Sequence, residues 1–291
     1  MYHQSTGPLL PTMNTTGAYR RARRILTHPT TRGRRLRTLR QVARVHARGA
    51  LGLSTVVPLG DRSRILASPE STSSMRAVYA SPPDAAEVAV WRRWLAPGDL
   101  FLDVGANVGL YSLLAAELGA QVVALEPDEA ARSWLEQNVA LNGYSVRVVP
   151  AAVGAEVGEV CFSVAADVYG HVVDGGVEAP ESTRVPLTTV DEVLAGRYAA
   201  GVKVDVEGYE RPVVEGMLSA LSDARVGLLQ LEWNAASQIR AGEDREPLRA
   251  LLARYGYGVY EPVRGGLVPL DGVPRGANVF AARAEVAGLL R

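Results

Sequence analysis

Asp103 and Glu126 are acidic residues that each lie at or just after the end of a short apolar run. A carboxylate at the end of the second run can accept both hydroxyls of a ribose. One at the end of the first can hold a cationic amine or order the following loop. Gly105 permits a tight turn there, and Gly109 lets a helix begin close to the strand and to a ligand. The pattern predicts a nucleoside-binding site.

The glycine pattern separates two kinds of nucleoside ligand. A dinucleotide fingerprint needs Gly-x-Gly-x-x-Gly, because its backbone N–H groups approach a pyrophosphate. Here Ala106 and Asn107 follow Gly105, so the second close-approach glycine is missing, and Asp103 would place a negative charge beside phosphate. A ligand with a ribose, a positive amine and no phosphate fits better, which favours S-adenosylmethionine over NAD. The alternative is that the glycines serve only strand–helix packing.

A second group of polar residues follows a later apolar run and could carry the reaction. A hydroxyl acceptor must lose its proton during methyl transfer, which calls for a base or a metal. Asp205 could bind the amine of the donor or the acceptor hydroxyl, and Glu207 could be the base. His171, the only histidine outside the basic N-terminal segment, is a further candidate base. Alternatively, the acids cap the next helix and His171 is an ordinary loop residue.

Three further residues are expected to contact the acceptor. Tyr209 and Glu210 lie just after these acids, and Glu232 ends another apolar run. Asp205, Glu232 and Asn234 could also bind Mg²⁺, because hard cations take carboxylate and amide oxygens. Their spacing does not establish a metal site, so a metal-free site is favoured. The residues expected to bind the donor are Asp103, Gly105, Ala106, Asn107, Gly109, Glu126, Pro127 and Asp205.

The elements that would position these residues alternate in type along the chain. Apolar runs predict strands at residues 100–104, 121–125, 146–149, 202–206, 225–231, 258–263 and 278–282. Helical spacing predicts helices at residues 34–53, 82–95, 109–118, 128–141, 188–194, 209–221 and 247–255. A hairpin is predicted at residues 153–164 and a loop at 167–184. The alternation indicates a Rossmann-like α/β fold, with a mostly parallel seven-stranded sheet and helices on both faces.

The charge is unevenly distributed although the formal net charge is zero. Residues 1–60 hold eleven arginines and no acid, which leaves 20 bases against 31 acids in the rest. An acidic main domain matches a phosphate backbone poorly, so no nucleic acid is expected as a partner. The basic segment fits a solvated leader, a helix at about residues 34–50 that docks on an acidic partner, or an organelle transit peptide.

Three regions follow from this organisation. Residues 1–53 form an Arg-rich extension that is partly helical or disordered, residues 54–98 a lead-in hairpin and helix, and residues 99–291 the main domain. Cys161 is the only cysteine, so no internal disulfide is expected, and a reducing cytoplasm fits best. No apolar stretch approaches the ~20 residues that span a bilayer, so no membrane partner is expected. The oligomeric state stays open, with a homodimer as one option.

The motifs together resemble the FkbM family of methyltransferases. They are Asp103-Val-Gly-Ala-Asn-Val-Gly-Leu-Tyr-Ser112, Glu126-Pro127, Asn138, Thr189-Val-Asp191 and Val202-Lys-Val-Asp205-Val-Glu207-Gly208-Tyr-Glu210. The first is shared by most class I methyltransferases, whereas the last is much more specific. The resemblance covers roughly residues 100–233. It implies a class I methyltransferase fold, S-adenosylmethionine as donor and, for many relatives, O-methylation of sugar or polyketide hydroxyls.

We therefore expect an S-adenosylmethionine-dependent O-methyltransferase that acts on a sugar, a glycoside or a polyketide-type natural product. One alternative is a non-catalytic nucleoside-binding or partner-docking protein that uses the Arg-rich segment as its arm. The presence of Asp103, Glu126 and Asp205 argues against it. The other alternative is methylation of an N acceptor, which often uses an Asn/Asp-Pro-Pro-aromatic motif that is absent here. The sequence does not name the acceptor.

Overall fold

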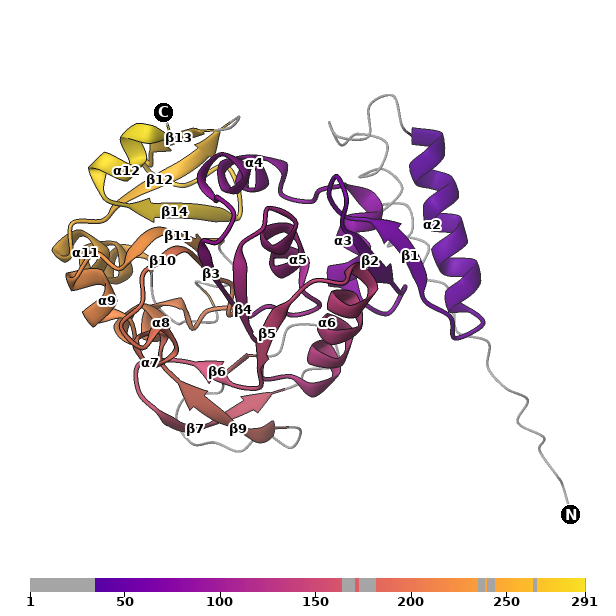
Figure 1. Cartoon of the computed structure of the whole chain (residues 1–291), viewed down its shortest axis with the longest axis horizontal. Coiled ribbons are helices and arrows are strands. Elements are labelled where there is room, and N and C mark those ends of the chain that lie inside the picture. The colour runs from indigo at the N-terminus through magenta and orange to yellow at the C-terminus, as the bar shows by residue number, and fades with distance from the viewer. Residues whose placement is uncertain are drawn as a thin grey trace, which may run out of the picture.

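The computed structural model describes residues 35–163, 171–172, 182–234, 239, 244–263 and 266–290. Its main sheet has eight strands in the order β13-β12-β14-β11-β10-β3-β4-β5 (Figure 1). They are β3 (Leu100–Val104), β4 (Gln121–Leu125), β5 (Val146–Val149), β10 (Ala199–Val204), β11 (Val226–Glu232), β12 (Gly258–Val263), β13 (Gly266–Pro269) and β14 (Asn278–Ala282). The strands from β5 to β11 are parallel, and β14, β12 and β13 are antiparallel to their neighbours.

This sheet confirms the predicted Rossmann-like α/β fold and corrects the strand count. Each of the seven predicted strands forms, and β13 adds an eighth at the edge by pairing with β12. The sequence of β13 is Gly-Leu-Val-Pro, which is too short and too poor in apolar residues to show a strand period. The carboxyl ends of β3, β4, β10 and β11 share one edge, where ligands bind in such sheets.

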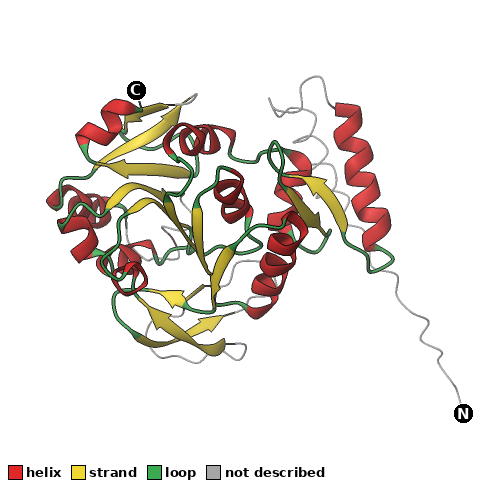
Figure 2. Cartoon of the chain, viewed as in Figure 1, coloured by secondary structure: helices red, strands yellow, loops and turns green. Residues whose placement is uncertain are grey.

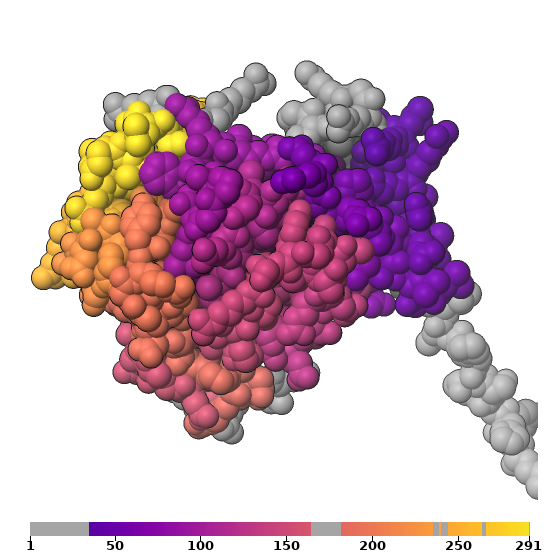
Figure 3. All heavy atoms as spheres, in the orientation of Figure 1, coloured from indigo at the N-terminus to yellow at the C-terminus, as the bar shows by residue number. Residues whose placement is uncertain are grey.

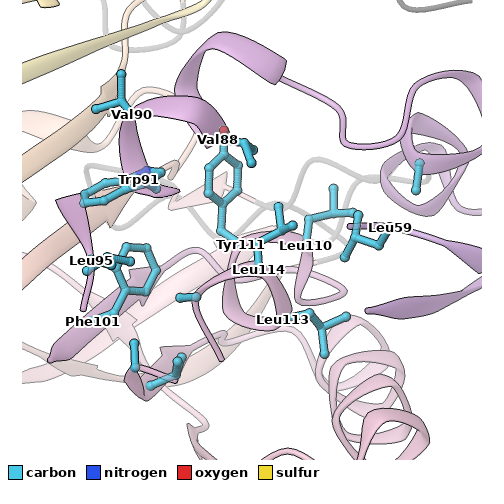
Figure 4. Close-up of a cluster of buried hydrophobic side chains, with 14 of the residues drawn as sticks. Leu59, Val88, Val90, Trp91, Leu95, Phe101, Leu110, Tyr111, Leu113 and Leu114 are labelled. Carbon is cyan, nitrogen blue, oxygen red and sulfur yellow. The ribbon is translucent and has the colours of Figure 1, made fainter. Parts of the chain in front are cut away.

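Helices lie on both sides of the sheet (Figure 2). They are α4 (Ala85–Trp94), α5 (Leu110–Glu117), α6 (Glu129–Asn142), α7 (Val190–Leu194), α8 (Glu210–Glu215), α9 (Leu218–Ser222), α11 (Glu246–Arg254) and α12 (Ala284–Leu289). Side chains alternate between the faces of a strand, so Phe101 of β3 packs with α4 and α5, whereas Leu102 packs with α7, α8, α9 and α11. Figure 4 shows Trp91 of α4 against Phe101. Their ring centroids lie 5.0 Å apart.

A separate four-stranded sheet follows β5 in the chain. Its strands are β6 (Ala152–Val153), β7 (Gly158–Ser163), β8 (His171–Val172) and β9 (Ser182–Thr188), in the order β6-β9-β7-β8. The predicted hairpin at residues 153–164 is wrong in its pairing, because β7 pairs with β9 instead of β6. The start of β9 was predicted as loop. In this strand Val185 and Leu187 are buried with Phe162, and this long-range packing selects the partner.

Residues 35–79 pack beside α6 and form one end of the molecule (Figure 3). They comprise α2 (Arg35–Gly49), the hairpin of β1 (Thr55–Pro58) and β2 (Arg64–Ala67), and α3 (Thr72–Tyr79). The fully buried Asn138 of α6 anchors this hairpin by accepting a hydrogen bond from the backbone N–H of Leu66, at 2.8 Å. The sequence did not predict α3, because the Thr-Ser-Ser at its start favours helices weakly. Across the described ranges, no helix has both the length and the apolarity needed to cross a bilayer.

Candidate active site

A crevice of about 800 Å³ opens at the carboxyl ends of the central strands. Small-molecule sites occupy roughly 300–1,000 Å³, so this crevice is large for its kind. One part of its wall, here called the strand-end wall, comprises the loop at Gly105 and the acids Glu126, Asp205 and Glu232. The other part, called the lead-in wall, comprises α3 and the turn that leads into α4.

Gly105 brings the ends of β3 and β10 together. Its φ is +73°, and a Cβ at this position would lie 2.1 Å from the backbone carbonyl oxygen of Asp205, so only glycine fits. Ala106 and Asn107 follow it along the crevice. Gly109 lies behind the wall, where a Cβ would meet the side chain of Leu135. The sequence predicts Gly109 near the ligand, but in the structure Gly109 allows the start of α5 to pack closely against Leu135 of α6.

Glu126 lies at the end of β4 and lines the crevice together with Pro127. One carboxylate oxygen accepts the backbone N–H of Asn107 at 2.7 Å, and the other accepts that of Asp128 at 2.9 Å. Burial raises the pKa of Glu126 to about 7, although these bonds act against the rise. A carboxylate oxygen has two lone pairs, so each retains one for a ligand hydroxyl. This geometry fits the ribose contact predicted for Glu126.

Asp103 is fully buried beneath the crevice and does not line it. One of its oxygens accepts the hydroxyl of Ser112 at 2.6 Å, and the other lies 3.6 Å from the Lys203 ammonium. The sequence predicts that Asp103 itself holds the donor amine, but its buried position does not match this role. Asp103 can act on a ligand only through the residues it orients.

Lys203 is a central residue that the sequence analysis did not single out. Its ammonium lies 3.1 Å from a carboxylate oxygen of Asp205 and 4.9 Å from the ring centre of Tyr111, and its side chain is 4% exposed at the crevice wall. Burial would lower the pKa of Lys203, but the charges of Asp205 and Asp103 outweigh burial and raise it. Lys203 is the only lysine in a chain with thirty arginines, which was an available signal.

Asp205, Glu207 and Glu232 form an acidic group inside the crevice, with carboxylate oxygens within 4.8 Å of one another. One oxygen of Glu232 accepts the amide N–H of Asn234, and the other is buried without a hydrogen-bond partner in the described chain. Burial, followed by the charges of Asp205 and Glu210, raises the pKa of Glu232 to about 8. These three acids could hold a cation, with Glu207 in the place predicted for Asn234.

The other predicted residues are divided between the crevice and the interior. Tyr209 lines the crevice. Glu210 is fully buried and accepts a hydrogen bond from Arg245 at 2.8 Å, so its position does not match the predicted acceptor contact. His171 belongs to β8, where its backbone pairs with Ser163 of β7. The side chain of His171 lies outside what the structure describes.

The lead-in wall contributes polar residues that the sequence analysis missed. Arg76 of α3 donates a hydrogen bond to Asp84, whose carboxylate also accepts the hydroxyl of Tyr111 at 3.1 Å. That hydroxyl accepts the side-chain N–H of Gln230 at 3.1 Å. Asp84 has a φ of +52°, and a left-handed non-glycine residue often marks a functional site. No local sequence pattern signals this network, since its members lie on four separate elements.

Comparison with known proteins gives a family and a set of similar structures. The model of the methyltransferase FkbM domain matches residues 103–259, more than half of the chain. No curated protein matches. The tRNA (uracil-54, C5)-methyltransferase of Pyrococcus abyssi, solved with S-adenosyl-L-homocysteine, is 16% identical with a TM-score of 0.41, over 79% of this chain and 43% of that one. The 16S rRNA N2 G1207 methyltransferase of T. thermophilus, solved with AdoMet and guanosine, is 15% identical with a TM-score of 0.42, over 79% and 50%.

A third structure, the precorrin-6y C5,15-methyltransferase of Geobacter metallireducens, is 14% identical with a TM-score of 0.37, over 68% of this chain and 87% of that one. Two of the three enzymes act on RNA, which overturns the exclusion of nucleic acid as a partner. That exclusion was wrong, and it had rested on net charge alone. The family match confirms the resemblance seen in the motifs, and the chain belongs to the FkbM family of methyltransferases.

Proposed function

We propose that the protein transfers the methyl group of S-adenosylmethionine to a hydroxyl oxygen of a small molecule. The observation that carries this proposal is the buried, unpartnered oxygen of Glu232 beside Asp205 in the crevice. A carboxylate with a raised pKa can take a proton near neutral pH, which a hydroxyl acceptor requires. A neutral amine can attack through its lone pair without first losing a proton, so an amine acceptor has less need of such a base.

The residues of the strand-end wall fit this donor. Glu126 presents a positioned carboxylate to a ribose, and Asp205 with the nearby Glu207 suits a ligand with positive amine and sulfonium groups. The same acids would repel a pyrophosphate, which argues against a dinucleotide. When bound, S-adenosylmethionine supplies a methyl group already activated on its sulfonium sulfur. Positioning by the wall can then contribute much of the acceleration.

The remaining task of the protein is to orient the hydroxyl and to accept its proton. We assign the proton to the free oxygen of Glu232, and the Lys203 ammonium lies beside the neighbouring Asp205 as its counter-charge. Glu207 lies close enough to Glu232 to share in binding the acceptor. His171 stays a predicted alternative base, because its side chain is outside the described structure.

A methyl-transfer screen tests this proposal. The purified protein is incubated with S-adenosylmethionine and with matched pairs of compounds that differ only in a hydroxyl or an amino group. Mass spectrometry then detects the gain of one methylene mass. We expect hydroxyl compounds to be methylated in preference to their amino partners, with and without EDTA. Methylation of only the amino partners, or of RNA alone, would refute O-methylation of a small molecule.

A further inference from the structure

Arg76 is a half-buried cation in the crevice that lies outside the family match. Its side chain keeps 42% of its surface accessible, and it lines the crevice from α3. Arginine carries five N–H donors in a planar fork that matches a carboxylate. Within the described residues, the guanidinium makes one hydrogen bond, from a terminal nitrogen to Asp84. Donors are therefore left over for a ligand.

The charges around Arg76 make it distinctive. Seven carboxylates and two cations, Lys203 and Arg76, lie among the described residues that line the crevice. Lys203 is 4% exposed and is held between Asp103 and Asp205. An anionic group that enters this acidic crevice would be repelled everywhere except near Arg76. Recognition of a carboxylate thus falls to this side chain.

The surroundings of Arg76 connect it to the loop at Gly105. Asp84 holds the guanidinium, and Tyr111 holds Asp84 through its hydroxyl. Tyr111 is the second residue of α5, the helix that begins directly after this loop. The ring of Tyr111 also lies against the Lys203 ammonium. The fork of Arg76 is therefore fixed relative to the residues that fit the nucleoside part of the donor.

We propose that Arg76 binds the amino-acid carboxylate of S-adenosylmethionine, and that Asp84 and Tyr111 position its guanidinium. This inference rests on the proposed donor. The donor combines a cationic sulfonium and amine, which suit the acids of the strand-end wall, with one carboxylate, which those acids would repel. Arg76 resolves this conflict because a charged bidentate pair is directional as well as attractive.

Binding of two ligands that differ only in the carboxylate tests the inference. Calorimetric titration measures the Kd of S-adenosylhomocysteine and of its decarboxylated analogue, which keeps the amine. We expect the wild-type protein to bind S-adenosylhomocysteine at least about tenfold more tightly, as a charge-assisted hydrogen bond allows. In Arg76→Met this preference should vanish, with the decarboxylated analogue changed less than about twofold.

Two further variants protect the test against misfolding and unspecific effects. Arg76→Met combined with Asp84→Asn removes both charges of the pair, so no unpaired carboxylate remains, and it should show the same selective loss. Arg197→Met, which changes an arginine in the turn after α7 and outside the crevice, should bind like wild type. An unchanged preference in Arg76→Met, or equal loss of both ligands in both Arg76 variants, overturns the inference. Equal binding of both ligands by wild type overturns it too, whereas binding of neither refutes the proposed donor.

Discussion

The two walls of the crevice are built in different ways. The strand-end wall takes its residues from the ends of adjacent strands, so the sheet itself places Glu126, Asp205 and Glu232 together. The lead-in wall takes Arg76 and Asp84 from elements that are held against the sheet by side-chain packing and hydrogen bonds. The strand-end wall is fixed by the sheet and therefore suits chemistry that a whole family shares. The lead-in wall can change without altering the sheet. We expect variants of the two walls to fail in different ways.

The largest effect is expected from Glu232→Gln on the strand-end wall. Removal of a general base typically costs about 10²- to 10⁴-fold in rate, so kcat should fall by that order while the Kd of S-adenosylhomocysteine stays nearly unchanged. Steady-state kinetics and calorimetry check the two quantities. A proportional rise in Kd would instead make Glu232 a binding residue.

The pH profile of the wild type sharpens this prediction. The pKa of Glu232 is raised to about 8, and a base acts only when deprotonated, so kcat should rise with pH up to about 8 and then level. Glu232→Gln should lack this rise. A rise that persists in the variant would assign the proton to another group, with His171 as the predicted candidate.

The next effect concerns the stability of the strand-end wall. Lys203→Met leaves Asp103 and Asp205 without their cation, and breaking a buried pair typically costs roughly 3–5 kcal/mol. Chemical denaturation should show this fall in the free energy of unfolding, and Asp103→Asn in the same chain should restore part of it. An unchanged unfolding midpoint would show that the two acids are stabilised by other means.

The sequence predicted the strand-end wall far better than the lead-in wall. The bounds of β3, β4 and β5 were predicted as the structure has them, because short apolar runs with glycine and acidic ends are local signals. The position of Lys203 between two acids was not predicted, because it depends on the parallel pairing of β3 with β10. Spacing also placed Asp103 and Glu210 in contact with ligands, whereas both are buried behind the wall.

The lead-in wall lacked such local signals. Residues 72–79 have no strong helical pattern, and α3 forms where its apolar side chains, Met75 among them, are buried against the hairpin. Arg76 and Asp84 are ordinary charged residues in sequence, and they reach the crevice only through tertiary packing. Functional residues of this kind could be found from the crevice geometry but not from spacing along the chain.

A smaller effect is expected for binding of the ribose. Glu126→Ala removes a charged acceptor and should weaken S-adenosylhomocysteine binding by roughly 10- to 100-fold, whereas Glu126→Asp should keep part of the affinity. Calorimetry measures both, with Glu129→Ala on the exposed start of α6 as control. If both Glu126 variants bound like wild type, the ribose would have to lie elsewhere in the crevice.

The smallest expected effect on binding comes from Asn138, which connects the lead-in hairpin to the crevice. Asn138 accepts the N–H of Leu66 in the lead-in hairpin and donates to the carbonyl of Val108, which lines the crevice, at 2.9 Å. Asn138→Ala leaves these groups unpaired and should lower the free energy of unfolding by roughly 1–3 kcal/mol. Ligand affinity should fall only a few-fold, because each wall keeps its own contacts. This fall corresponds to roughly half a kcal/mol or more of binding free energy and is separate from the loss of stability. Gln137→Ala is the matched control, because among the described residues the Gln137 amide donates to Ser133 of the same helix. A loss of affinity as large as that of Glu126→Ala would show that the walls act as one unit, because the shape of the crevice would then depend on this single amide.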